Sequence, residues 1–392
     1  MSSKLHHEPA VGGEVRPGIE GFLQSRAYQG RRIGLVTNQT GVTPGGVPTW
    51  KALLDAGAEL VALFGPEHGF RGEAQDAVHV QDETFAGVRV YSLYGERFRP
   101  TPDMLTGIDL MVYDIQDVGC RFYTYLQTLG YTMEACAGAG LSYVVLDRPN
   151  PIGGIAVEGG PLGAEHDSFV GAYGLPHRFG MTMGEFALYL QKNYVPSIDL
   201  TIFPVDGWQR TMYETTLPWI SPSPNLPTVD AAVIYPGSCL FEGTNLSEGR
   251  GTTRPFECFG APWIDGESLR EAAAGLGLPG VVFSSLFFTP TFSKHAGAQC
   301  SGITIHVKDR ESFRALRTGI ALVKLVHDRH SKEFEWRRDW ERKGSYFFDR
   351  LAGGPAVREM IDAGTGLEEI YAAACEGHEL FMSKRKECLI YG

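Results

Sequence analysis

The segment LVALFGPEHGFRG, residues 60–72, is the most informative part of the chain. Its first five residues, Leu60–Phe64, form a continuous apolar run, and the residues after them are rich in glycine and ionisable groups. A short continuous apolar run is typical of a parallel strand with helices on both faces, since neither face of such a strand meets water. The segment therefore predicts a buried strand followed by a polar loop.

Similar runs recur through the first half of the chain, at Arg32–Thr37, Val88–Ser92, Leu110–Tyr113 and Tyr143–Leu146. Stretches with a helical pattern occur at Thr49–Ala56, Arg121–Gly138 and Thr182–Lys192. The last stretch opens with Thr182 and has Glu185 three residues later, which is the spacing of a capping box. This order predicts right-handed βαβ units in an α/β fold, with a Rossmann-like, doubly wound and mostly parallel sheet.

A proline-rich segment, LPWISPSPNLPTVD at residues 217–230, interrupts this alternation. Proline fits neither a helix interior nor a central strand, so the segment marks the crossing into a second domain. Beyond it, strand-like runs at Gly280–Phe288 and Gly302–Val307 and an amphipathic helix at Ser312–His327 do not alternate strictly. We therefore expect a Rossmann-like domain over residues 15–229 and a second, smaller α+β domain over residues 230–392.

The charge balance limits the partners of the protein. With 35 Lys and Arg against 46 Asp and Glu, the formal net charge is −11, which repels nucleic acid and anionic lipid. No stretch is apolar enough for a membrane span or a secretory signal. The seven cysteines occur without a CxxC pair. These features predict a cytoplasmic protein with reduced thiols, and neither a nucleic-acid nor a membrane partner.

Polar residues follow four of the predicted strands directly. In an open parallel sheet, the loops at the carboxyl ends of the strands meet at one edge, and ligands bind there near the point where the strand order reverses. We expect these loops to form one shared site. Its candidate residues are Asn38, Glu67, His68, Arg71, Asp114, Gln116, Asp117, Arg121, Tyr123, Asp147, Arg148 and Asn150.

Glu67 is the strongest candidate for a catalytic group. It lies between Pro66, which restricts the chain, and His68-Gly69, where glycine allows a tight turn or a close approach to a ligand. A partly buried carboxyl group beside a histidine is suited to act as a proton donor.

The aspartates after the strands have a plainer interpretation as helix caps or turn residues. For Asp147 alone this interpretation is favoured. We also expect one of Asp114 and Asp117 only to cap the helix that begins near Gly119.

The second domain offers a glycine-rich polar segment, Phe241–Phe256, that cannot pack a core. Its length favours a wall of the site over a simple connection. Its candidate residues are Glu242, Asn245, Glu248, Arg250 and Thr252. The segment TFSKHAG at residues 291–297, with Lys294 and His295, is a weaker candidate of the same kind.

The sequence favours neither a cofactor nor a metal. The first strand is followed by NQTGVTPGG, which lacks the G-x-G-x-x-G order of a dinucleotide site. The chain also lacks a P-loop and a G-x-S-x-G nucleophile elbow. A divalent cation held by Glu67, His68, Asp114 and Asp117 is chemically reasonable, but no metal-ligand spacing supports it.

Nine longer motifs follow one another along the chain: GLVTNQTGV, ALFGPEHGFRGE, VYSLYG, YDIQDVGCRFYTY, VVLDRPNPIGG, SFVGAYGLPHRFGMT, SPSPNLPT, YPGSCLFEGTNLSEGRGTTRPFE and FTPTFSKHAG. Together they closely resemble the exo-β-N-acetylmuramidases of the NamZ type. The resemblance runs from about Gly34 to the C-terminal KRKECLIYG.

This resemblance implies a Rossmann-like domain and a smaller domain that closes an active-site cleft. It also implies release of a non-reducing terminal N-acetylmuramic acid from peptidoglycan fragments, without a cofactor. Glu67 falls on the family's proposed catalytic glutamate. Without a secretory signal, the expected role is recycling of cell-wall sugars inside the cell.

The chemistry of such a reaction assigns further roles. Glycoside hydrolysis usually needs two carboxyl groups, and the partner of Glu67 is Asp117, Asp114, Glu242 or Glu248. The lactyl carboxylate of muramic acid requires a guanidinium, for which the candidates are Arg71, Arg121, Arg148 and Arg250. Asn38, Gln116 and Asn150 are suited to bind hydroxyl and acetamido groups, and Tyr123 to stack on a sugar.

Two other functions remain open at this point. One is a metal-dependent hydrolase that acts on another substrate. The other is a non-catalytic protein that binds muropeptides. The substrate expected from the resemblance is a small anionic aminosugar, as part of a disaccharide or an oligosaccharide.

Overall fold

The first lobe of the protein is built on an eight-stranded sheet. The computed structural model describes residues 4–5, 14–72 and 82–392. The strands lie in the order β1-β8-β7-β6-β2-β3-β5-β4, and every neighbouring pair is parallel except β4 with β5. Their bounds are Lys4–Leu5 (β1), Arg32–Thr37 (β2), Glu59–Gly65 (β3), Glu83–Phe85 (β4), Val88–Ser92 (β5), Leu110–Asp114 (β6), Ser142–Leu146 (β7) and Asp199–Phe203 (β8).

The strand order reverses between β2 and β6. From β2 the chain adds β3 and β5 on one side, and then β6, β7 and β8 on the other side. This is the order of a doubly wound Rossmann sheet, so the predicted fold class is confirmed. Each of the five runs predicted in the first half of the chain is a strand of this sheet, whereas β1, β4 and β8 were not predicted.

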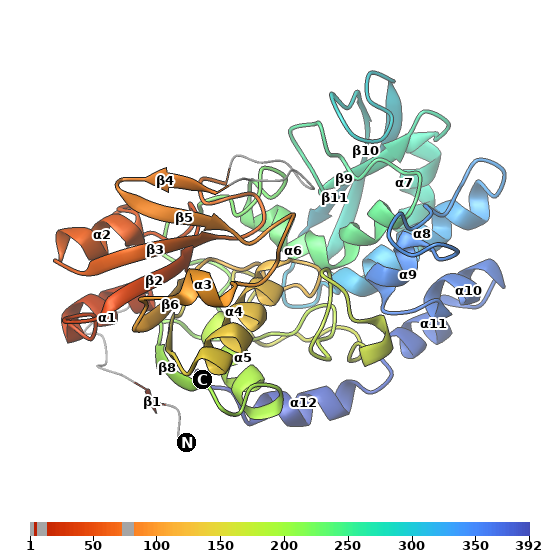
Figure 1. Ribbon diagram of the computed structural model, residues 1–392. Helices are drawn as coiled ribbons and strands as arrows, with labels where there is room; N and C mark the ends of the chain where they lie inside the picture. Colours follow the sequence, from red (N-terminus) through yellow and green to blue (C-terminus); the bar gives the residue numbers. More distant parts are fainter. Residues whose placement is uncertain (1–3, 6–13, 73–81) are drawn as a thin grey trace.

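Helices cover both faces of the sheet (Figure 1). Residues of β6 point alternately into two apolar cores, with Leu110 and Val112 in one core and Met111 and Tyr113 in the other. The helices on the first core are α1 (Gly18–Ser25) and α2 (Thr49–Asp55). Those on the second core are α3 (Pro102–Leu105), α4 (Tyr125–Ala139) and α5 (Met183–Asn193).

The starts of two of these helices test the sequence patterns. The capping box before α5 is confirmed, because the backbone N–H of Glu185 donates to Thr182 Oγ1 and that of Thr182 donates to Glu185 Oε2. By contrast, α4 begins at Tyr125 and not near Gly119 or Arg121. The chain before it is an irregular loop that reaches toward the second lobe.

The second lobe combines a small antiparallel sheet with helices. Its sheet has the order β10-β11-β9, with bounds Cys258–Ala261 (β9), Val281–Phe288 (β10) and Cys300–Val307 (β11). The short helix η1 (Ala164–His166) belongs to the first lobe. The remaining helices are α6 (Val229–Ser238), η2 (Cys239–Gly243), α7 (Gly266–Gly275), α8 (Ala315–Arg329), α9 (Phe347–Ala352), α10 (Ala356–Asp362), α11 (Leu367–Ala374) and α12 (His378–Lys386). The smaller α+β domain that was predicted is present.

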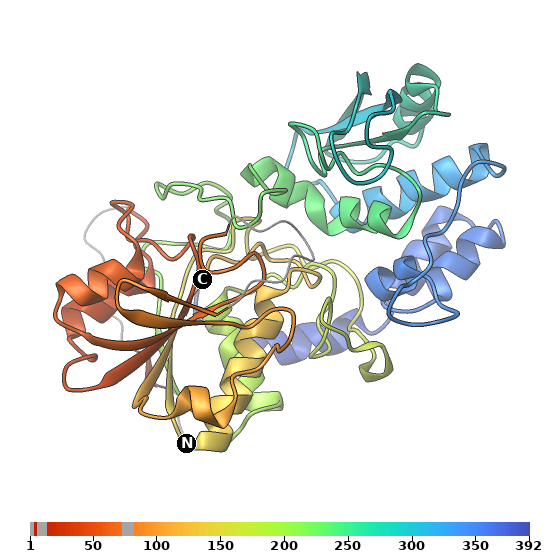
Figure 2. The ribbon, with the colours of Figure 1, turned by 45° about the horizontal axis from the view of Figure 1, so that its top comes forward.

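We propose that the boundary between the two lobes lies at residues 229–230, since α6 begins at Val229 and packs on α8. The C-terminal helix is an exception, because α12 returns to lie beside the helices of the first lobe (Figures 1 and 2). There Phe381 of α12 contacts Tyr189 of α5.

The two lobes are joined by a continuous apolar core and by buried polar contacts. Val145 of the sheet and Leu322 of α8 belong to the same cluster of buried side chains. Glu158 of the first lobe pairs with Arg178 and accepts hydrogen bonds from the first backbone N–H groups of α8 at 2.9 and 3.2 Å. In the part of the chain that the structure describes, no helix has the length and apolar character needed to cross a membrane.

Candidate active site

A cavity of about 500 Å³ lies between the two lobes. Loops after β3, β5, β6, β7 and β8 form its wall on the first lobe, and residues from α6 onward form its wall on the second. A cavity of this size fits a ligand as large as a disaccharide or a drug molecule. The expected edge of the sheet therefore does face a cavity.

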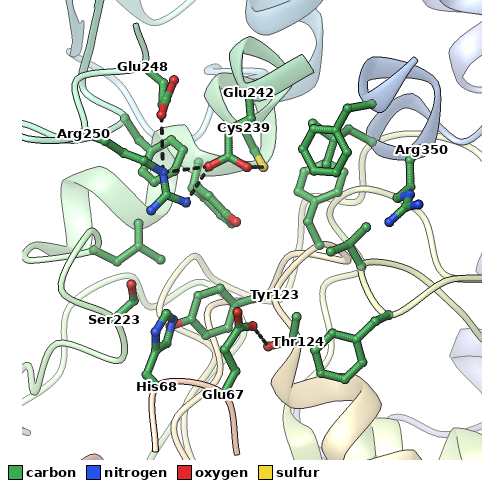
Figure 3. Close-up of a pocket in the computed structure, with 18 of the residues that line it drawn as sticks. Glu67, His68, Tyr123, Thr124, Ser223, Cys239, Glu242, Glu248, Arg250 and Arg350 are labelled. Carbon is green, nitrogen blue, oxygen red and sulfur yellow. Dashed lines mark hydrogen bonds and ion pairs between the residues drawn. The ribbon is translucent and has the colours of Figure 1, made fainter. Parts of the chain in front are cut away.

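Glu67 and His68 enter this cavity from the loop after β3 (Figure 3). The loop turns sharply, because His68 and Gly69 both adopt the left-handed backbone region, with φ of 69° and 79°. Such a φ is rare for a residue other than glycine. The loop also folds back closely, since a Cβ on Gly65 would lie 2.8 Å from the Phe70 nitrogen. This turn keeps the Glu67 side chain 94% buried while it still faces the cavity.

Thr124 holds the carboxylate of Glu67. Its Oγ1 donates a hydrogen bond of 2.5 Å to Glu67 Oε2, and it precedes the first residue of α4. A hydrogen bond this short restricts the orientation of the carboxyl group. The sequence did not single out Thr124, although it lies next to the predicted Tyr123, which also lines the cavity.

Charged residues of the glycine-rich segment form part of the opposite wall (Figure 3). Glu242 accepts from Arg250 Nε at 2.9 Å and from Nη2 at 2.5 Å. Glu248 contacts Arg250 at 3.3 Å and Lys294 Nζ at 2.7 Å. Burial disfavours a charge on Glu248, but Lys294 and Arg250 outweigh burial and lower its pKa. Two carboxylates and a guanidinium therefore face Glu67 from the second lobe.

Part of the cavity wall is aromatic and was not predicted from the sequence. The residues concerned are Tyr94, Phe98 and Phe169 of the first lobe and Trp340 and Phe347 of the second. Tyr94 and Phe98 lie in the loop after β5, so their position after a predicted strand was one usable signal. Trp340 lies in EWRRDWERK at residues 335–343, where two tryptophans stand among charged residues, and that unusual composition was a usable signal.

Several predicted site residues instead fill the crevice between β2 and β6. Arg148 makes two hydrogen bonds to the buried carboxylate of Asp114, at 2.5 and 3.0 Å, and Asp114 also accepts from Thr49. Asn38 donates to Tyr125, and Gln116 donates to the backbone of Asp117 and Pro149. Only about 20 Å³ of space remains there, beside Trp219. These side chains satisfy one another and do not line the large cavity.

Two buried aspartates also do not line the cavity. Asp117 accepts from the backbone N–H of Gly119 at 2.6 Å, and burial raises its pKa to about 7. Asp147 accepts from Thr182, Gly184 and Tyr391, and burial raises its pKa to about 6. Asp147 therefore links β7, the start of α5 and the C-terminus.

The remaining first-lobe candidates also have structural partners. Arg121 donates to the carbonyls of Leu175 and Leu351, and burial lowers its pKa to about 10. Asn150 donates to the Met181 carbonyl at 2.9 Å. Arg71 points to the surface, where it pairs with Glu83 at 2.9 Å.

Three candidates of the second lobe stabilise the glycine-rich segment. Asn245 bonds to the backbone of Glu333 and Glu335. Thr252 Oγ1 donates to the Gly249 carbonyl at 2.6 Å. His295 Nε2 lies 2.7 Å from the Asn245 carbonyl oxygen. Of the predicted site residues, the cavity is lined by Glu67, His68, Tyr123, Glu242, Glu248 and Arg250.

Within residues 4–5, 14–72 and 82–392, no three His, Cys, Asp or Glu side chains are arranged to hold a metal ion. The cation considered from the sequence would have used Asp114 and Asp117. In the structure these two carboxylates accept from Arg148 and from the Gly119 backbone.

Comparison with known proteins identifies the family. The family model described as "Exo-beta-N-acetylmuramidase NamZ, N-terminal" matches residues 33–230, and the model described as "Exo-beta-N-acetylmuramidase NamZ, C-terminal" matches residues 233–391. The chain belongs to the NamZ family.

Relatives of this NamZ family member cover nearly its whole length. It is 45% identical over 385 residues to the peptidoglycan β-N-acetylmuramidase NamZ of Bacillus subtilis, an alignment that spans 96% of this chain and 92% of the relative. A crystal structure of a DUF1343 family protein from Bacteroides fragilis has a TM-score of 0.88 and 34% identity, covering 97% of this chain and all of that one. A second such protein from the same organism has a TM-score of 0.78 and 32% identity, covering 96% and 99% of the two chains.

Proposed function

We propose that the protein is an exo-acting glycoside hydrolase that releases non-reducing terminal N-acetylmuramic acid from peptidoglycan fragments. The observation that carries the proposal is the position of Glu67, which is buried, held by Thr124 and directed into the cavity between the lobes. The name of the Bacillus subtilis relative supports the substrate class.

In the proposed mechanism Glu67 donates a proton to the oxygen of the bond that breaks. Protonation of the leaving group by a carboxylic acid is the usual first requirement of glycoside hydrolysis. The hydrogen bond from Thr124 keeps the carboxyl group in one orientation. His68, which follows Glu67 in the same turn, lines the cavity beside it.

Glu242 is the second carboxyl group of the proposed mechanism. The two hydrogen bonds from Arg250 favour its ionised form, which is the form that stabilises positive charge at the anomeric carbon or activates water. Asp114 and Asp117 are less suited to this role because neither lines the cavity. Glu248 is less suited as well, since Lys294 and Arg250 both engage it.

We further propose that this reaction serves recycling in the cytoplasm. All seven cysteines are free thiols, and six of them are buried. Free buried thiols agree with a reducing compartment. The substrate is then a small muropeptide-derived sugar and not the intact wall.

Replacement of Glu67 tests the proposal. We expect Glu67→Gln to lower kcat on a chromogenic N-acetylmuramide by about 10²–10⁴-fold, with an unchanged circular dichroism spectrum. Glu96→Gln is the matched control, because Glu96 is an exposed acid on the neighbouring loop that does not line the cavity. Near-normal turnover by Glu67→Gln would remove Glu67 from the mechanism.

Hydrolysis of a muramic acid–glucosamine disaccharide, followed by NMR, tests the substrate and the configuration of the first product. Loss of activity after exhaustive chelation would favour a metal-dependent hydrolase instead. Saturable binding of the disaccharide without any product would favour a muropeptide-binding protein.

A further inference from the structure

The rim of the cavity on the second lobe carries a guanidinium group that pairs with no carboxylate of the described residues. Arg337 lines the cavity and is exposed. Among the ion pairs of the described residues, none involves Arg337. Its guanidinium carbon instead lies 4.8 Å from the ring centre of Trp340 and 5.8 Å from that of Phe347.

The other two arginines of the cavity differ from Arg337 in this respect. Arg250 pairs with Glu242 and Glu248. Arg350 pairs with Asp339 and Glu341 at 2.9 and 2.7 Å. Their charges are therefore balanced by the protein, and an anionic ligand would have to compete with a carboxylate for either of them.

The backbone fixes the position of Arg337. Its N–H donates to the Gly243 carbonyl at the end of η2, and its carbonyl accepts from the N–H of Phe347 at the start of α9, both at 2.9 Å. The rings of Trp340 and Phe347 lie 4.5 Å apart at 35°, so they form a platform under the guanidinium. A cation held over aromatic rings is stabilised without being neutralised.

The chemistry of the substrate supplies a partner for this group. N-acetylmuramic acid differs from N-acetylglucosamine by a lactyl ether, which adds a methyl group and a carboxylate. A planar guanidinium binds a carboxylate through two parallel hydrogen bonds, and aromatic rings beside it offer apolar contact to a methyl group. Of the arginines first considered for this role, Arg71, Arg121 and Arg148 do not line the cavity, and Arg250 is already paired.

We propose that Arg337, stacked on Trp340, binds the lactyl carboxylate of the substrate and selects muramic acid over glucosamine. This proposal rests on the proposed function, since it names the group that recognises the substrate of that reaction. It places the specificity of the enzyme in the C-terminal lobe, while the proton donor comes from the N-terminal lobe.

The test compares two sugars that differ only in the lactyl group. N-acetylmuramic acid and N-acetylglucosamine are titrated by calorimetry into the wild type and into Arg337→Met, Arg337→Lys and Arg338→Met. Arg338 is the matched control, because its guanidinium also lies over an aromatic ring, that of Tyr346 at 4.2 Å, yet it does not line the cavity.

We expect Arg337→Met to weaken binding of N-acetylmuramic acid by about 10–100-fold, the size of one hydrogen-bonded charge pair, and to leave binding of N-acetylglucosamine unchanged. Arg337→Lys keeps the charge without the planar fork, and we expect it to retain part of the preference. Arg338→Met should behave like the wild type. A preference for N-acetylmuramic acid that persists in Arg337→Met would overturn the proposal.

Kinetics on the chromogenic muramide separate this proposal from the proposed function. We expect Arg337→Met to raise KM more than it lowers kcat, because Arg337 binds a group away from the bond that breaks. A wild-type protein that binds N-acetylmuramic acid through Arg337 but releases no product would refute the hydrolase and leave the binding assignment standing.

Discussion

The crevice between β2 and β6 and the cavity between the lobes are both rich in polar residues. They differ in whether these residues pair with one another or face open space. In the crevice, Asp114 and Arg148 satisfy each other and about 20 Å³ of space remains. In the cavity, Glu67 and Arg337 face about 500 Å³ of space. The difference shows that polar residues at strand ends can be the core of a loop cluster, so an open volume is needed to identify a site.

The first way to sharpen this comparison is to remove the carboxyl group that faces Glu67. We expect Glu242→Gln to lower kcat on a chromogenic muramide by about 10²–10⁴-fold, a loss typical of a group that acts on the reacting atoms. The melting temperature should change little. Glu257→Gln, which alters the residue directly after the glycine-rich segment and does not line the cavity, should keep normal turnover, and equal effects of both changes would contradict the assignment.

The second way is to break the ion pair that fills the crevice. Arg148→Met leaves the Asp114 carboxylate buried without its cation, and we expect this to destabilise the protein by about 3–5 kcal/mol. Denaturant unfolding measures the loss. Adding Asp114→Asn should recover much of it, because the second change removes the uncompensated charge. If Arg148→Met instead lowered kcat/KM at unchanged stability, the crevice would belong to the active site.

A third prediction concerns Asp117, which is buried and does not line the cavity. Burial raises its pKa in the folded protein from 3.8 to about 7, so the folded state holds a proton that the unfolded state releases above pH 4. The stabilising effect of that proton is present at low pH and is lost as the pH rises toward 7 and beyond. Asp117→Asn changes the free energy of unfolding, and we expect this change to be more favourable at pH 8 than at pH 4 by on the order of 2 kcal/mol. Melting curves at the two pH values check this. A gain in stability at pH 4 alone would contradict the predicted pH dependence.

The smallest expected effect tests how Thr124 acts on Glu67. Thr124→Val keeps the shape of the side chain but removes the hydrogen bond, and we expect kcat to fall by about tenfold with little change in KM. Thr124→Ser restores the hydroxyl and should recover most of the rate. A fall in thermal stability without a fall in kcat would show that Thr124 only stabilises the start of α4 and does not act on Glu67.

Much of the fold could be predicted because the apolar runs are continuous. β2, β3, β5, β6 and β7 all lie within a few residues of their predicted bounds, since apolar runs this short, bounded by polar turn residues, favour buried strands over helices. β8 escaped notice because its run, Asp199–Phe203, begins with a charge and is only partly apolar.

The site was less predictable, because sequence patterns do not reveal which polar groups satisfy each other. Glu67 could be found from its own turn, GPEHG. Asp114 and Arg148 are 34 residues apart, and nothing in either segment indicates that they pair. Arg337 and Trp340 reach the cavity only because α9 and η2 hold their loop, a long-range contact with no local signature.

The C-terminal residues have a consequence for how the chain reaches its folded state. Tyr391 donates a 2.5 Å hydrogen bond to Asp147, and the N–H of Ile390 donates a 2.9 Å hydrogen bond to Glu185. Both carboxylates lie deep in the N-terminal lobe and become fully satisfied only when this last segment docks. The carboxylates of Asp147 and Glu185 therefore lack these two hydrogen-bond donors until residues 390 and 391 dock. A fragment ending at residue 229 would lack these hydrogen-bond donors to two carboxylates of its interior.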